Sequence, residues 1–175
     1  MSAATTTAPQ PFYTNAMCTI ALWSSVVIVD AAGAIDTVRM GRLFDAYEKV
    51  LARPVPQVFG FCIIRPGVPV SSSEARAEAT RRTKELGGGL AHVALVTEDA
   101  AAGGLLLRAA VRGYSMLTRS TKVSYHASVP DAVQALAPMV ATSGSRSPAE
   151  ELQHAVAAVR ASFRPSSRTH RSIRS

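Results

Sequence analysis

Three consecutive serines form the first candidate functional site in the sequence. Ser71, Ser72 and Ser73 follow a proline-containing bend and open a predicted helix that runs to Leu86. A phosphate on one of them would meet free backbone N–H groups and the positive end of the helix dipole. The added charge would change what docks at this corner of the protein. Simple helix capping is the alternative, because Ser71 and Glu74 have the spacing of a capping box.

The other residue types that commonly carry catalysis are dispersed. The four histidines fall in different predicted elements, without the spacing of a metal site: His92, His126, His154 and His170. The sequence has no Ser-His-Asp order, no glycine-rich phosphate loop after a strand and no pair of inward carboxylates. Cys18 and Cys62 lie in apolar runs without a CxxC spacing, so they are predicted to be small buried hydrophobic groups. We therefore predict a non-enzymatic protein without a cofactor or a metal.

A second candidate surface is a predicted helix over residues 100–117 that is apolar on nearly all sides. Four of its residues could form a face that contacts a protein partner or a second copy of the chain in a homo-oligomer: Leu106, Arg108, Arg112 and Tyr114. Burial under the C-terminal helix is an equal alternative, and a ligand cavity between this helix and the sheet is a third. Its arginines could also hold an acidic group or keep the helix soluble.

The basic C-terminal tail is the third candidate. The net charge is +7, and +4 of it lies in the last 35 residues. Four arginines there could contact a polyanion, with strong salt dependence: Arg164, Arg168, Arg171 and Arg174. No aromatic residue accompanies them, so base stacking has no support and nucleic-acid binding is expected to be weak at most. A solvated tail without a function is the alternative.

The 175 residues, 47% of them hydrophobic, fit one domain with a tail. The first 16 residues lack the basic start and apolar block of a secretory signal, and no apolar run approaches the ~18 residues of a membrane span. We therefore expect a cytoplasmic protein without a membrane span. The predicted divisions are a flexible lead over 1–16, an α/β domain over 17–140, a linker over 141–147, an amphipathic helix over 148–163 and a disordered basic tail over 164–175.

Apolar periodicity predicts the elements that position these candidates. Two runs rich in β-branched residues between positions 17 and 32 predict a hairpin. Asp36 is a predicted N-cap, and the helix after it has one apolar face: Met40, Leu43, Phe44, Tyr47 and Leu51. The serine-started helix has a small apolar face of Ala75, Ala79 and Leu86, so it is expected to lie shallowly on the sheet. Glu78 and Arg82 have the spacing of an ion pair on its surface.

The remaining apolar runs predict strands at 58–64, 92–98 and 123–127, with helices at 130–140 and 148–163. Strands and helices therefore alternate after the hairpin. This order predicts an α/β fold with a four- to five-stranded mixed sheet that is mostly parallel. One antiparallel strand is expected at its edge, and helices are expected to pack on it.

The order of these elements resembles the STAS domain family. Gly33-Ala34-Ile35-Asp36 follows the hairpin, and an amphipathic helix, a strand and the serine-started helix come next. The resemblance covers roughly residues 17–140 and is closest to the bacterial variant labelled STAS/SEC14-like. Anti-sigma-factor antagonists of this family are regulatory proteins switched by a partner kinase at a serine or threonine that starts a helix. That position maps onto Ser71, Ser72 or Ser73, although this chain has Val70 where the family usually has aspartate.

The resemblance and the serine corner together predict a bacterial regulatory or scaffolding module that acts by protein–protein binding. Phosphorylation at the helix N-terminus would switch it. Two alternatives remain from the sequence. One is a carrier of a small apolar ligand or lipid, as the SEC14-like label implies, and the other is a homo-oligomeric structural protein with a polyanion-binding tail.

Overall fold

Six strands form a single mixed sheet in the computed structural model, which describes residues 8–98, 121–140 and 147–163. They lie side by side in chain order: β1 (Gln10–Thr14), β2 (Cys18–Trp23), β3 (Val26–Ala31), β4 (Val58–Ile64), β5 (Leu90–Thr97) and β6 (Lys122–His126). The first three strands are antiparallel neighbours, and β3 to β6 are parallel. The predicted α/β fold with a mostly parallel mixed sheet is confirmed. The sheet is larger than expected, with six strands instead of four or five.

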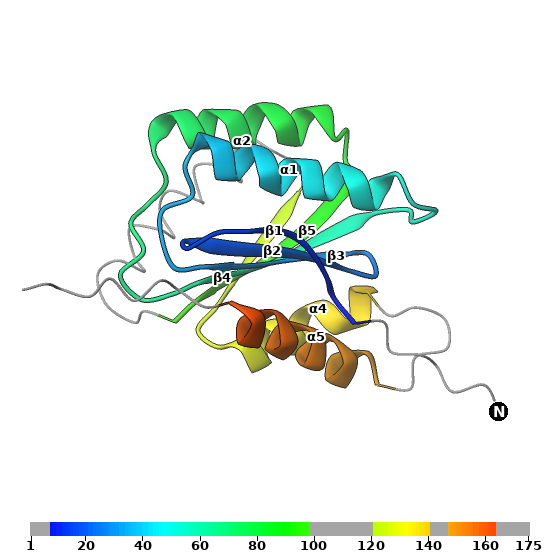
Figure 1. Cartoon of the computed structure of the whole chain (residues 1–175). Coiled ribbons are helices and arrows are strands. Elements are labelled where there is room, and N and C mark those ends of the chain that lie inside the picture. The colour runs from blue at the N-terminus through cyan, green and yellow to red at the C-terminus, as the bar shows by residue number, and fades with distance from the viewer. Residues whose placement is uncertain (1–7, 99–120, 141–146, 164–175) are drawn as a thin grey trace, which may run out of the picture.

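Helices cover both faces of this sheet (Figure 1). On one face lie α1 (Thr37–Leu51) and α2 (Ser73–Glu85), and on the other lie α4 (Val129–Val140) and α5 (Pro148–Ser162). Each face has its own apolar core. None of the helices in the described ranges is long and apolar enough to cross a membrane.

Strand β3 shows why the sheet is covered twice. Val27 and Val29 point into the core beneath α1, and Val26 and Ile28 point into the core beneath α4 and α5. Successive side chains of a strand alternate between faces, so a continuous apolar run needs a partner layer on each side. The hairpin that delivers β3 turns at Ser24, which takes a positive φ of 51°.

The predicted flexible lead over residues 1–16 is wrong for residues 10–14, which form strand β1. Residues 10–14 pair with β2 in antiparallel register, with an irregularity between Pro11 and Tyr13. Phe12 and Tyr13 pack against the core on the α1 side. A proline is tolerated here because an edge strand has one side without ladder hydrogen bonds. The expected antiparallel strand, β2, therefore lies one place inside the sheet. The edge is formed by β1, which runs in the same direction as β3 and was hidden in a short, proline-containing run.

The ends of α1 and α2 differ in how well they were predicted. Asp36 caps α1 as expected, because its Oδ1 accepts the N–H of Arg39 at 2.8 Å. The cap of α2 is Ser72 and not Ser71: the Ser72 Oγ accepts the N–H of Ala75 at 3.2 Å. The predicted capping box is therefore wrong by one residue. The bend after β4 includes Ser71, and the helix begins one residue later than expected.

The predicted Glu78–Arg82 ion pair on α2 is also replaced. Glu78 binds Arg81 at 2.6 Å, three residues away. Arg82 instead reaches across to α1, where it contacts Asp45 at 3.0 Å and Glu48 at 2.8 Å. Arg82 therefore joins the two helices of this layer.

Helix α5 closes the other face. The amphipathic helix predicted over 148–163 buries one apolar stripe, which ends at its C-cap: Leu152, Val156, Val159 and Phe163. Ser147 occupies the N-cap position without a side-chain cap hydrogen bond. Pro148 at the first helical position supplies the helix start instead, because its fixed φ suits that position.

Candidate ligand-binding pocket

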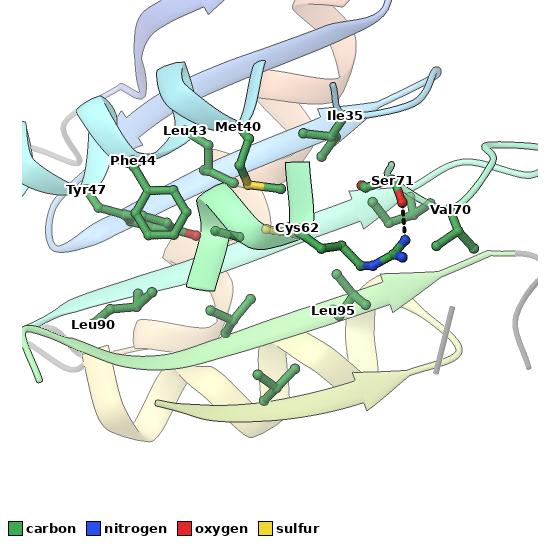
Figure 2. A pocket seen from close by; sticks show the side chains of 15 residues that line it. Ile35, Met40, Leu43, Phe44, Tyr47, Cys62, Val70, Ser71, Leu90 and Leu95 are labelled. Carbon is green, nitrogen blue, oxygen red and sulfur yellow. Dashed lines mark hydrogen bonds between the residues drawn. The ribbon is translucent and has the colours of Figure 1, made fainter. Parts of the chain in front are cut away.

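An apolar pocket of about 150 Å³ lies between the sheet and the α1–α2 layer (Figure 2). Tyr47 and Leu90 lie at one end, and Ile35, Val70 and Ser71 lie at the other, toward the carboxyl ends of the strands. Its fifteen lining residues come from α1, α2, β4, β5, β6 and the loops beside them. Nearly all of them are aliphatic or aromatic, so the pocket offers a water molecule few hydrogen bonds.

The pocket exists because the two helices above it carry side chains of different size. Helix α1 fills the space over the sheet with large residues such as Phe44 and Tyr47. The buried residues of α2 are Ala75, Ala79 and Thr83, which are too small to reach the strands. Accordingly α2 contacts α1 more than it contacts any strand. The space that α2 leaves over β4 and β5 is the pocket.

At the end of the pocket where Tyr47 lies, α1 closely approaches β4. A Cβ added to Gly60 would lie 2.5 Å from the Tyr47 hydroxyl oxygen and 3.2 Å from Val93. Glycine is therefore the residue that lets the tyrosine ring cross the strand. Burial raises the pKa of the neighbouring Cys62 thiol to about 12, against an opposing hydrogen bond from Tyr47. The thiol stays protonated and contributes apolar lining instead of a nucleophile.

Among the described residues that line the pocket, Arg76 at the rim is the one basic group. The Arg76 Nη1 donates to the carbonyl of Ser71, which is the dashed contact in Figure 2. The side chain is otherwise exposed at the first turn of α2. Of the eight arginines in the described residues, only Arg76 and Arg53 form no salt bridge. Sequence analysis did not single out Arg76, because its position beside a pocket depends on how α2 is tilted.

The three serines beside this rim have different roles. Ser72 caps α2, and Ser71 lines the pocket and gives its carbonyl to Arg76. The exposed Ser73 hydroxyl donates to the Glu74 carboxylate at 3.1 Å. The pKa of Glu74 is lowered first by its own backbone N–H and then by the hydroxyls of Ser72 and Ser73. Glu74 thus already occupies the anion position at this helix N-terminus, and a phosphate on a serine would share it.

A second polar cluster lies on the opposite face of the sheet. The Ser124 Oγ is 2.7 Å from His92 Nε2 and 2.8 Å from His126 Nε2. Ser124 and His126 pair in register with Ala94 and Val96, whose side chains belong to the core beneath α4 and α5. The cluster escaped sequence analysis because its two strands are separated in the chain. The alternation of Ser124 and His126 on one strand face was the available signal.

The three side chains form one hydrogen-bond chain centred on Ser124. The Ser124 hydroxyl has one hydrogen, so it donates to one imidazole and accepts from the other. The pKa values of His92 and His126 are both lowered, primarily by burial. Asp131 on α4 opposes this shift for His126. Both rings are therefore neutral at pH 7, and none of the three side chains lines the pocket.

Other candidate sites from the sequence have mixed outcomes. Cys18 and Cys62 are free and buried, as predicted. Among the residues that the structure describes, no group of three or more histidines, cysteines or carboxylates could hold a metal ion. The predicted partner face of Leu106, Arg108, Arg112 and Tyr114 lies outside the described residues. So do the tail arginines, Arg164, Arg168, Arg171 and Arg174.

Comparison of the chain with known proteins finds no matching family model, curated protein or solved structure. The resemblance to STAS domains therefore stays a prediction.

Proposed function

We propose that this protein is a non-enzymatic binding module that holds a small apolar molecule, or the apolar part of one, between the sheet and the α1–α2 layer. The observation that carries the proposal is the nearly all-apolar pocket of about 150 Å³ under α2. An apolar cavity of about this size is large enough for benzene. Transfer of such a group from water into the pocket is favourable, by about 25 cal/mol for each Å² of apolar surface buried.

A ligand titration followed by NMR of the methyl groups tests this function. Toluene should shift the methyl signals of pocket residues such as Leu43, Val93 and Leu95. An Ala79→Leu substitution places extra carbons inside the pocket and should abolish those shifts. Ala77→Leu adds the same atoms on the exposed side of the same helix and should leave them intact. Toluene shifts that are absent, or equal in both variants, would refute the proposal.

A second candidate is the regulatory module switched at the serine corner, and one observation favours it. Ser71 lines the pocket while Ser72 and Ser73 are exposed beside it, so a partner docked at this corner would be sensitive to pocket occupancy. The expected modification site is Ser73, because the Ser72 hydroxyl is engaged in capping α2. Mass spectrometry of the protein isolated from its source cells should find phosphate on the peptide with these serines. An unmodified peptide across growth and stress conditions would contradict this candidate.

A further inference from the structure

We infer that the ligand of the pocket is a small organic monocarboxylate whose carboxylate binds the Arg76 guanidinium while its apolar part fills the pocket. The inference rests on the proposed binding function and adds the chemical class of the ligand. It follows from three features of the rim: a positive charge without an acidic partner among the described residues, guanidinium N–H groups without an acceptor there, and a limited volume behind them.

The charge of Arg76 is not neutralised by a carboxylate within the described residues. The nearby Arg39 and Arg82 each have acidic partners at hydrogen-bond distance. Glu74, on the same helix turn, directs its carboxylate to its own N–H and to serine hydroxyls. Arg76 makes the smallest contribution to the lowered pKa of Glu74. An anion at the rim would therefore find an available partner.

The donors of Arg76 fit a carboxylate. A guanidinium has five N–H groups in a fixed fork that matches the two oxygens of a carboxylate. Within the described part of the chain, the Arg76 side chain makes one hydrogen bond, to the neutral carbonyl of Ser71. If a ligand carboxylate replaces the Ser71 carbonyl as the acceptor, Arg76 gains a charged partner in place of a neutral one, and the hydrogen bond becomes stronger. Glu74 repels any anion at this point, and it repels a doubly charged phosphate more strongly than a singly charged carboxylate.

The volume behind Arg76 limits the rest of the ligand. A pocket of about 150 Å³ accepts a benzene-sized group, so the apolar part has about six carbons. A long acyl chain would leave most of its carbons in water. Phenylacetate, which joins one carboxylate to one phenyl ring through a single carbon, is therefore a suitable probe. Phenylacetamide has the same shape without the charge.

Isothermal titration calorimetry with these two compounds tests the inference. The wild-type protein should bind phenylacetate about tenfold more tightly than phenylacetamide, the ratio expected for one charge-assisted hydrogen-bonded contact. Arg76→Gln should remove this preference and leave phenylacetamide binding unchanged. Arg53→Gln is the matched control, because Arg53 also lacks a salt bridge but contacts Ser24 and Gln10, away from the pocket. Its preference for the acid should persist.

The outcomes separate this inference from the function it rests on. Equal affinity for the acid and the amide would overturn the inference and leave the apolar binding function standing. A preference for the acid that survives Arg76→Gln would assign the carboxylate to another group, which also overturns it. If neither compound nor toluene binds, the proposed function fails, and the inference fails with it.

Discussion

Removing the Arg65 guanidinium should destabilise this protein more than removing the Arg160 guanidinium, because Arg65 is paired with a fully buried carboxylate. Arg65 follows β4 and forms a two-pronged contact with Asp30 of β3, at 2.8 Å and 2.7 Å. The Asp30 side chain is 0% exposed and that of Arg65 is 25% exposed. The guanidinium also lies over the Phe163 ring, 4.7 Å from its centre. Arg65 therefore neutralises a buried carboxylate and connects the sheet to the end of α5.

The cost of Arg65→Met follows from these contacts. Breaking a buried ion pair by removing one partner costs about 3–5 kcal/mol, and the partial exposure of Arg65 places the value near the lower limit. Loss of the contact with Phe163 adds about 0.5–1 kcal/mol. We expect a total of about 3–4 kcal/mol, because a fully buried carboxyl group would be left without its partner. Replacing both residues, as in Asp30→Val with Arg65→Met, should return the stability to within about 1 kcal/mol of wild type.

Urea unfolding measures these differences through the fluorescence of Trp23, the single tryptophan, which is buried in the core beneath α4 and α5. Arg160→Met is the control, since Arg160 binds Glu98 at 2.8 Å in a partly exposed pair worth at most about 1 kcal/mol. If Arg65→Met does not fold, Arg65→Lys keeps the charge and should cost about 1.5 kcal/mol. A loss for Arg65→Met no larger than that for Arg160→Met would refute the argument.

Three further predictions test other parts of the structure. The lowered pKa values of His92 and His126 mean that the folded state binds fewer protons, so stability should fall as the pH drops below about 6.5. Thermal unfolding between about pH 7.5 and about pH 5.5 measures this, and a His92→Gln, His126→Gln variant with an unchanged slope would contradict it. Ser72→Ala should cost about 1 kcal/mol in urea unfolding and Ser71→Ala almost nothing, and the reverse order would place the cap one residue earlier. Gly60→Ala should cost about 1–3 kcal/mol by the same assay, because its Cβ would stand 2.5 Å from a buried tyrosine hydroxyl. A neutral effect would mean that α1 can shift without loss.

Helix α1 and strand β3 could be predicted because each carries two independent signals that agree. Helix α1 has a capping aspartate and a stripe of large apolar residues with helical period. Strand β3 has a continuous run of β-branched residues after a turn. Asp30 within that run gave no warning of its buried ion pair. Its partner, Arg65, lies 35 residues away and meets it only because β3 and β4 are parallel neighbours in register.

The partner of Arg82 could not be predicted for a related reason. Spacing within one helix identified Glu78, four residues earlier, as the nearest acid. Once α2 lies against α1, the acids of a different helix are closer. Two carboxylates on α1 then compete successfully with one on α2, because a single guanidinium can bind both. Spacing along one helix identifies only the ion-pair partners within that helix. The partner of a side chain between two helices depends on how the two helices pack.

The pocket beneath α2 was not predicted from the sequence, and its origin is a packing effect. The small apolar face of α2 led us to expect that the helix lies shallowly on the sheet. Small residues permit a close approach, but they bury too little apolar surface to drive one. The large residues of α1 set the height of the layer, and Arg82 holds α2 at that height. The mismatch between a large-faced and a small-faced helix is therefore what opens the pocket.

This origin makes the pocket a cost to stability. A closed cavity of about 150 Å³ would cost about 3–4 kcal/mol relative to a filled one, and an open pocket costs some part of that. Ala79→Leu, which fills the space, should therefore raise the midpoint of thermal unfolding while it abolishes toluene binding. Ala77→Leu should change neither. A less stable Ala79→Leu protein would mean that α2 cannot accept a larger residue and that the space is only a packing gap. A more stable protein that no longer binds is the outcome expected of a site in which function limits stability.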